Sequence, residues 1–233
     1  MSRRQVVDTP DSMISFIARL IMLPFLLFWR ALGWQPVGTI PENKKLVIIG
    51  APHTSGWDYL VSLAAAGYFG IRPTILVKHT LMPGPFGVFV RLMGGVPVDR
   101  SAAHNIVDQV VEMFDQREEM ILLLSPEGTR SKTDYWKTGF YHIALGAQVP
   151  ILPAFVNYRN KHAGFGPLIT PTGDIDADMT TIHDFYAANA SGLHPEKVSA
   201  GRGSRPAIST AAGRTGWARN VPDYVLGQQK IQL

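Results

Sequence analysis

The sequence predicts an α/β domain in which a mostly parallel or mixed sheet is flanked by helices. Short apolar runs bounded by Gly or Pro alternate along the chain with longer segments of helical character. The length of 233 residues suits one domain with a sizeable core, with or without a short appendage. The chain contains no cysteine, which excludes disulfides, thiolate–zinc sites and a cysteine nucleophile.

The strands are predicted from short, buried-looking segments, and the helices from the longer segments between them. The predicted strands are residues 47–50, 74–77, 120–124 and 151–156. The predicted helices are residues 57–69, 85–93, 103–116 and 139–146. Residues 35–45, which contain Pro and Gly, are expected to form a connector ahead of the first strand.

The N-terminal segment is apolar but too interrupted to cross a membrane. Residues 13–34 are nearly all apolar, yet Arg19 and Arg30 leave only the ten residues 20–29 uncharged. Ten helical residues extend about 15 Å, roughly half of a ~30 Å hydrocarbon core. We therefore expect a helix that lies in one leaflet of the interface rather than one that spans it.

Three residues of this segment refine the expectation. Pro24 would kink the helix, and Trp29 and Trp34 are of a residue type that settles at the headgroup level. Acidic residues precede the apolar run and no small-residue cleavage site follows it promptly, which argues against a signal peptide. A helix that packs on the domain's own core is the alternative.

The overall charge and hydropathy favour an anionic, partly apolar environment. Hydrophobic residues make up 46% of the chain and charged residues only 17%, so some apolar surface is expected to meet lipid or a partner. The net charge of +4 suits phospholipid headgroups, a phosphorylated substrate or nucleic acid, and its sign does not choose among them.

A histidine and a carboxylate follow the first predicted strand directly. His53 and Asp58 lie just past its carboxyl end, which is where ligands bind in parallel sheets. A neutral imidazole can take a proton near pH 7, and an aspartate can fix its tautomer. Ser55 and Asp58 also have the spacing of a helix-capping box, so a simple helix cap is the alternative. Five positions correspond to about 140° on a helix, so His53 is expected in the turn and Asp58 in the first helical turn.

A second polar cluster follows the predicted strand at residues 120–124. Arg130, Thr129 and the unhindered backbone of Gly128 could supply the planar and close-range donors that a phosphate needs. A strand-to-helix turn capped by a hydroxyl is the alternative. Lys137 could add a positive charge, although a solvated lysine is the more common outcome.

Four blocks in order resemble the glycerolipid acyltransferase family, which includes the lysophosphatidic acid acyltransferases. They are the His-x4-Asp block at residues 53–58, the glycine-led strand at 95–100, the Pro-Glu-Gly-Thr-Arg-Ser block at 126–131 and the Val-Pro-Ile-x-Pro strand at 149–153. The resemblance extends over about residues 40–190, and it raises the catalytic interpretation of His53 well above the helix-cap interpretation.

The resemblance implies an O-acyltransferase in which His53 is the general base and Asp58 orients its ring. The donor would be an acyl-CoA or acyl carrier protein thioester, and the acceptor a lysophospholipid such as 1-acyl-glycerol-3-phosphate. By resemblance, the acceptor would be held by Glu127, Gly128, Thr129 and Arg130, with Arg100 near its phosphate. Lys137 is a further candidate for the phosphate, and either Lys137 or backbone N–H groups near the helix start after His53 could stabilise the oxyanion. Glu127 would position Arg130 or a glycerol hydroxyl, since a carboxylate repels phosphate. An anionic membrane surface is expected as a further partner, and nucleic acid is not.

Two departures from the family pattern leave the acceptor open. Pro52 stands where the family often has asparagine, and Ser125 replaces the usual aromatic residue. Another lysolipid, a glycolipid or an unphosphorylated alcohol is therefore an alternative acceptor. A thioester hydrolase and a catalytically silent membrane-binding protein are alternatives from other classes.

No metal or cofactor is expected. Asp174, Asp176 and Asp178 imitate the start of a calcium loop, but Met179 replaces the turn glycine and Phe185 the bidentate glutamate. The chain also lacks a nucleotide-binding glycine loop and a His-Glu-x-x-His zinc motif.

The chain is expected to comprise three parts. Residues 1–35 form the interfacial helix, residues 36–195 the acyltransferase domain, and residues 196–233 a basic, flexible tail that could touch anionic lipid. The expected location is peripheral or monotopic at the cytoplasmic face of a membrane.

Overall fold

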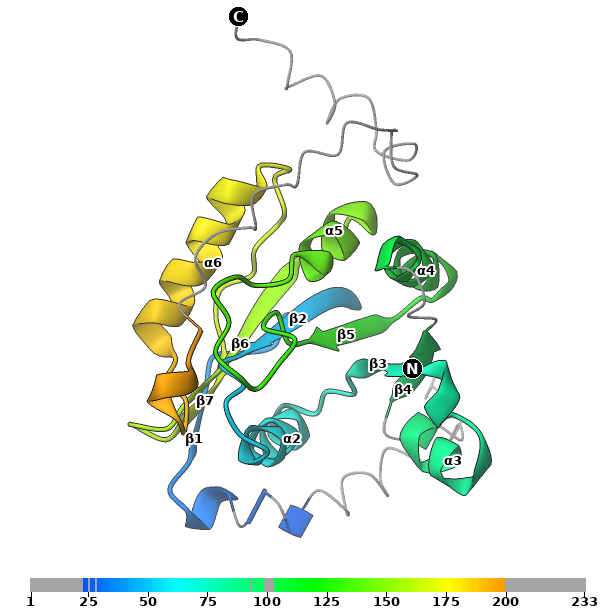
Figure 1. Cartoon of the computed structure of the whole chain (residues 1–233). Helices are drawn as coiled ribbons and strands as arrows, with labels where there is room; N and C mark the ends of the chain where they lie inside the picture. The colour runs from blue at the N-terminus through cyan, green and yellow to red at the C-terminus, as the bar shows by residue number, and fades with distance from the viewer. Residues whose placement is uncertain (1–22, 25, 28, 93, 99–102, 200–233) are drawn as a thin grey trace, which may run out of the picture.

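The sheet is the centre of the molecule. The structure is a computed structural model that describes residues 23–199, apart from residues 25, 28, 93 and 99–102. These residues form one seven-stranded sheet in the order β1-β7-β6-β2-β5-β3-β4. Strands β6 and β7 are antiparallel, and the other neighbouring pairs are parallel. Helices lie on both faces (Figure 1), so the predicted fold class is confirmed.

The elements have the following bounds. The strands are β1 (Gln35–Val37), β2 (Lys45–Ala51), β3 (Thr74–Lys78), β4 (Gly95–Val98), β5 (Met120–Leu124), β6 (Ile151–Asn157) and β7 (His162–Phe165). The helices are α2 (Trp57–Phe69), α3 (Gly84–Leu92), α4 (Ala103–Gln116), α5 (Gly139–Gly146) and α6 (Ile175–Asn189). Two short 3-10 turns are η1 (His79–Leu81) and η2 (Pro195–Lys197).

Every strand and helix predicted between residues 47 and 156 is present. Helices α2, α4 and α5 and strand β5 have the predicted bounds, while β2, β3, β6 and α3 differ by no more than two residues at either end. The glycine-led block forms β4, which pairs with β3 in parallel. The alternation of short apolar and longer helical segments is therefore a sufficient signal for the middle of the chain.

The sequence prediction omits β1, β7 and α6. The expected connector at residues 35–45 begins with β1, a three-residue strand too short to show an apolar pattern, which pairs with β7. Gly164 permits this pairing, because a Cβ there would overlap the carbonyl group of Val37. Helix α6 buries Met179, Ile182 and Tyr186, a helical spacing that is visible in the sequence.

The two faces of the sheet carry different cores. Val47 and Ile49 of β2 point to the face covered by α4, α5 and α6, where they join Phe114 of α4 in the largest cluster. Leu46 and Ile48 alternate with them and point to the α2 face. Each fully buried aliphatic side chain contributes about 1.5–3 kcal/mol. This burial holds the carboxyl end of β2 in place under the candidate site.

The described part of the N-terminal segment packs on the domain. Trp29 and Trp34 are 2% and 6% exposed, stack with ring centroids 6.2 Å apart, and join a cluster with Ala64 and Ala65 of α2. The expectation that the two tryptophans lie at the headgroup level is therefore wrong, and packing on the domain is right for them. The two small alanine side chains leave room for the indole rings. Residues 1–22, which carry Arg19, lie outside the described residues.

Some apolar side chains near this cluster remain on the surface. Leu23, Leu27 and Leu32 are 46%, 61% and 46% exposed, and Trp57 at the start of α2 is 58% exposed. None of the described helices is long and apolar enough to cross a bilayer.

Candidate active site

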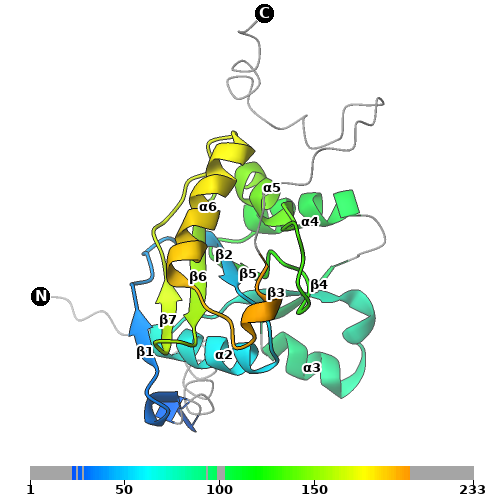
Figure 2. The ribbon, with the colours of Figure 1, turned by 60° about the vertical axis from the view of Figure 1, so that its left-hand side comes forward.

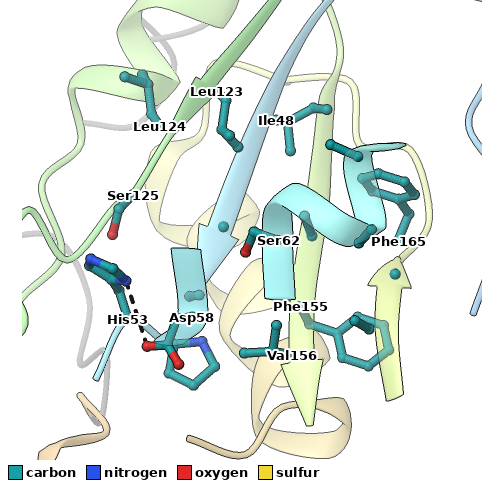
Figure 3. A pocket seen from close by; sticks show the side chains of 18 of the residues that line it. Ile48, His53, Asp58, Ser62, Leu123, Leu124, Ser125, Phe155, Val156 and Phe165 are labelled. Atoms are coloured by element: carbon teal, nitrogen blue, oxygen red, sulfur yellow. Dashed lines mark ion pairs between the residues drawn. The ribbon is translucent and has the colours of Figure 1, made fainter. Parts of the chain in front are cut away.

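The turn of residues 53–58, called the catalytic turn after its predicted role, joins the carboxyl end of β2 to α2. His53 lies between the two elements, and Asp58 is the second residue of α2, as expected. The Nδ1 atom of His53 is 3.6 Å from Oδ2 of Asp58 (Figure 3). The side chain of His53 is 32% exposed, whereas that of Asp58 is 3% exposed. The pair therefore presents an accessible base in front of a buried acid.

The carboxylate of Asp58 is held by three donors besides the histidine. Its Oδ2 accepts hydrogen bonds from the backbone N–H groups of Thr54 at 2.6 Å and Ser55 at 2.7 Å. Its Oδ1 accepts one from the hydroxyl of Tyr158 at 2.7 Å. Burial raises the pKa of Asp58, but the hydrogen bonds from His53, Tyr158, Ser55 and Thr54 together outweigh it and leave the pKa below its ordinary value. Asp58 is therefore ionised at neutral pH and fixed in orientation.

The capping interpretation is half correct. Asp58 does reach back to the N–H of Ser55, which is the carboxylate half of a capping box. The N-cap residue is Gly56, however, and the hydroxyl of Ser55 accepts from the N–H of Trp57 at 3.2 Å rather than from that of Asp58. One carboxylate thus organises the start of α2 and faces the histidine at the same time.

Tyr158 is a site residue that the sequence analysis missed. It follows directly after β6, the strand that neighbours β2, and the edge of its ring meets Trp34 with centroids 5.0 Å apart. The signal available in the sequence was its place past the carboxyl end of a parallel strand, where His53 also lies. Burial and, to a smaller extent, the hydrogen bond to Asp58 raise the pKa of Tyr158, so the hydroxyl keeps its proton.

Glu127 lies beneath the catalytic turn rather than in the open site. It is 2% exposed, and its Oε1 and Oε2 are both 3.3 Å from the backbone nitrogen of His53, which donates to them. Burial raises the pKa of Glu127 to about 7, against the opposing effect of the His53 N–H group and ring. The structure shows this contact with His53, and no hydrogen bond or ion pair from Glu127 to Arg130 among the described residues.

The exposed part of the second cluster lies beside the catalytic turn. Gly128 has a φ of +62°, and a Cβ there would come within 2.7 Å of Cε and Nζ of Lys137. Nη1 of Arg130 would be 3.9 Å from a Cβ on Gly56. Thr129 is exposed, and its Oγ1 accepts from the N–H of Ser131 at 3.2 Å.

The fold thus brings the two polar blocks together at one edge of the sheet. Arg130, Lys137 and Thr129 are exposed there, next to the start of α2. Guanidinium, ammonium and hydroxyl groups on one surface can bind a phosphate. Arg100 lies outside the described residues, so its predicted place near the phosphate remains a prediction.

An apolar cavity of about 330 Å³ opens at the catalytic pair. His53, Asp58 and Ser125 lie at one side of it and Phe165 at the other (Figure 3). Between them the wall is formed by aliphatic and aromatic side chains of the sheet and α2, such as Ile48, Leu123, Ala65 and Phe155. A cavity of this size and lining suits a hydrocarbon chain better than a polar ligand.

The described residues contain no group of three or more His, Asp or Glu side chains arranged to hold a metal ion. Asp174 caps α6 by accepting from the N–H of Ala177 at 3.1 Å, and Asp178 accepts from the hydroxyl of Tyr141 at 2.8 Å. These two carboxylates therefore support the fold of α6.

Comparison with known families adds a description to this geometry. A family model described as Acyltransferase matches residues 37–157. That range contains all four blocks, at residues 53–58, 95–100, 126–131 and 149–153.

Two curated bacterial proteins are similar over the same region. The 1-acyl-sn-glycerol-3-phosphate acyltransferase of Salmonella typhimurium is 36% identical over 129 residues, which cover 52% of this chain and 51% of that protein. Its counterpart in Escherichia coli is 39% identical over 127 residues, which cover 51% and 50%. The chain therefore spans about half the length of the curated relatives that it matches.

A solved structure shares the fold. The crystal structure of the 1-acyl-sn-glycerophosphate (LPA) acyltransferase from Thermotoga maritima superposes with a TM-score of 0.56, covering 81% of this chain and 86% of that one. The two sequences are 16% identical, so this likeness concerns the fold alone.

Proposed function

Because the chain belongs to the acyltransferase family, we propose that it transfers a fatty acyl group from a thioester to the hydroxyl of a lysophospholipid, with 1-acyl-glycerol-3-phosphate as the first acceptor to test. The observation that carries this proposal is the His53–Asp58 pair at the mouth of an apolar cavity, beside Arg130. The names of the bacterial relatives support the choice of acceptor.

The chemistry begins with the free ring nitrogen of His53. Nδ1 faces Asp58, which leaves Nε2 for the acceptor hydroxyl. Nε2 takes the hydroxyl proton as the oxygen attacks the thioester carbonyl, and Asp58 stabilises the imidazolium that forms. The tetrahedral intermediate then expels the thiolate, which recovers the proton from the imidazolium. Base catalysis of this kind contributes about 10²–10⁴-fold.

The oxyanion of the intermediate needs donors that are not already engaged. Asp58 accepts the N–H groups of Thr54 and Ser55, and Glu127 accepts that of His53, so these three are unsuitable. The ammonium of Lys137 has no hydrogen-bond or ion-pair partner in the described part of the chain, and it lies against Gly128. Lys137 is therefore the leading candidate for the oxyanion, because its ammonium can stabilise the negative charge that develops there.

The polarity of the site indicates where the remaining parts of the two substrates bind. The acyl chain occupies the apolar cavity, since His53 lines this cavity together with aliphatic and aromatic side chains. The acceptor phosphate lies over Arg130 and Thr129 on the exposed side. Pro52 and Ser125, where the sequence departs from the family, both line the cavity, so they act on the acyl chain more directly than on the headgroup.

Contact with a membrane involves the exposed leucines. Leu27 and Leu32 point to solvent, and the guanidinium of Arg30 between them lies 5.8 Å from the ring centroid of Tyr68. A cation flanked by apolar side chains suits an anionic bilayer surface. Deleting the whole N-terminal segment would remove the buried Trp29 and damage the fold. The double variant Leu27→Ser/Leu32→Ser tests the contact instead, and equal liposome partitioning of variant and wild type would contradict it.

The function is tested by supplying purified protein with radiolabelled acyl-CoA or acyl carrier protein and a panel of lysolipids. We expect labelled diacyl lipid that forms only when an acceptor is present, and most with the phosphorylated one. If labelled free fatty acid forms at the same rate with and without an acceptor, the protein is a hydrolase. If neither product forms, the protein is a lipid-binding protein without catalytic activity.

A further inference from the structure

The chain returns to the catalytic turn after α6. Residues 191–199, here called the 191–199 strap, leave α6 and pass in front of the sheet (Figure 2, orange). The backbone N–H of Ser191 donates to the carbonyl of Val156 at 3.0 Å, and its backbone carbonyl accepts from the N–H of Tyr158 at 3.0 Å. At the far end, the buried hydroxyl of Ser199 accepts from the N–H of Thr133 at 3.2 Å. The strap is therefore anchored at both ends.

The middle of the 191–199 strap rests on Thr54, the residue after the catalytic histidine. The N–H of His194 donates to Oγ1 of Thr54 at 3.4 Å. Gly192 is buried, and a Cβ there would lie 2.8 Å from Cγ2 of Thr54, 3.0 Å from its Oγ1 and 2.9 Å from Cγ2 of Val198. Gly192 is not among the glycines with a positive φ. Glycine is required at this position because a side chain would collide with Thr54, and not because of the backbone conformation.

The residues under the 191–199 strap are those that hold Asp58. Thr54 donates its backbone N–H to Oδ2, and Tyr158 donates its hydroxyl to Oδ1. Thr54 is itself 2% exposed, so it cannot move away from the strap without disturbing the turn. Two of the donors that orient the acid are thus fixed by Gly192, His194 and Ser191.

We propose that the 191–199 strap is a positioning element of the active site, and that Gly192 acts through Thr54 to hold Asp58 behind His53. The strap lies entirely beyond residues 37–157, the part of the chain that matches the family model. The activity readout of this proposal rests on the proposed acyl transfer. The proposal adds to that reaction a rate-determining structural element that contacts neither substrate. A displacement of the order of 1 Å at a catalytic group costs up to about 10²-fold in rate.

The test is Gly192→Ala in the full chain, with Leu193→Ala as the matched control. Leu193 is the next residue and is 40% exposed. We expect kcat to fall by about tenfold or more in Gly192→Ala, with KM for both substrates changed by less than about threefold. In Leu193→Ala, kcat should stay within about twofold of wild type. Adding Thr54→Ser to Gly192→Ala removes the Cγ2 atom that the new methyl meets, and should restore part of the lost kcat.

An amide-exchange measurement by NMR separates this proposal from the proposed function. We expect the N–H groups of Thr54 and Ser55 to exchange faster in Gly192→Ala than in wild type, whether or not the protein transfers acyl groups. Wild-type kcat and wild-type exchange in Gly192→Ala would overturn the proposal, as would rescue by Val198→Ala but not by Thr54→Ser. If Gly192→Ala does not fold, Thr54→Val, which removes the acceptor for His194, should still speed exchange of the Thr54 amide; unchanged exchange would overturn the proposal.

Discussion

The catalytic turn, residues 53–58, and the loop of residues 126–131, for which we propose phosphate binding, lie side by side but are built differently. In the turn, Asp58 is 2% exposed and accepts hydrogen bonds from two backbone N–H groups and a tyrosine hydroxyl. In the loop, Arg130 is exposed and makes no side-chain hydrogen bond or ion pair with the described residues. The turn is thus organised before a substrate binds, whereas the guanidinium of Arg130 is free to adapt to a ligand.

The difference fits what each part would do in the proposed reaction. A general base has to lie within a few tenths of an ångström of its productive position, so its supports are short and buried. A phosphate can be met by long side chains, which lose rotamer freedom only on binding. Changes in the turn should therefore affect kcat and stability, and changes in the loop should affect KM.

Among the residues around His53, the largest effect is expected from Asp58→Asn. An amide cannot accept from all of the donors that surround the carboxylate, and it cannot stabilise an imidazolium by charge. We expect kcat to fall on the order of 10²-fold while KM stays nearly constant. Steady-state kinetics with a saturating lysolipid measures the split, and a change confined to KM would remove the distinction between turn and loop.

Glu127 is the residue of the loop that is buried against the turn, and it should make the stability of the turn depend on pH. Its pKa of about 7 in the fold exceeds the ordinary 4.5, so its contribution is full below pH 4.5 and is lost as the pH rises through about 7. The loss amounts to at most about 3 kcal/mol. Urea unfolding at several pH values should show this decline in wild type and not in Glu127→Gln. A parallel decline in both proteins would contradict the burial of the acid.

In the loop, Arg130→Lys keeps the charge but loses the fork of donors. We expect KM for a phosphorylated acceptor to rise about tenfold with little change in kcat. The matched control is an unphosphorylated lysolipid, for which the two proteins should give the same KM. An equal rise for both acceptors would show that Arg130 does not contact the phosphate.

The smallest effect is expected from Tyr158→Phe. Asp58 keeps its two backbone donors, so the loss of one hydrogen bond of about 1 kcal/mol should lower kcat about fivefold. Comparing thermal unfolding of the two proteins controls for damage to the fold. A loss as large as that of Asp58→Asn would show that Tyr158 takes part in the chemistry itself.

The sequence was informative wherever one short segment contained the whole signal. The strands and helices from residue 45 to 157 each have their own apolar pattern. The His-x4-Asp block likewise predicts that His53 lies in a turn and Asp58 in the first turn of a helix. The burial of Trp29 and Trp34 was not readable, because apolar residues suit a protein core as well as a membrane.

Contacts between distant segments could not be predicted. Tyr158 meets Asp58 across 100 residues, and Glu127 meets the backbone of His53 across 74. Nothing in the residues near 158 or 127 indicates these partners, since they depend on the order of strands in the sheet. Gly192 is a further case, because the residues around it in the sequence do not indicate the Thr54 side chain that it lies against.

The general-base role of His53 is tested most directly by comparing wild type with His53→Ala in the radiolabelled acyl-transfer assay, with liposome binding and circular dichroism as controls for folding. We predict that wild type forms acceptor-dependent diacyl lipid and that His53→Ala loses about 10²–10⁴-fold in kcat with unchanged lipid binding. Product formation by His53→Ala at the wild-type rate would contradict the role assigned to the histidine.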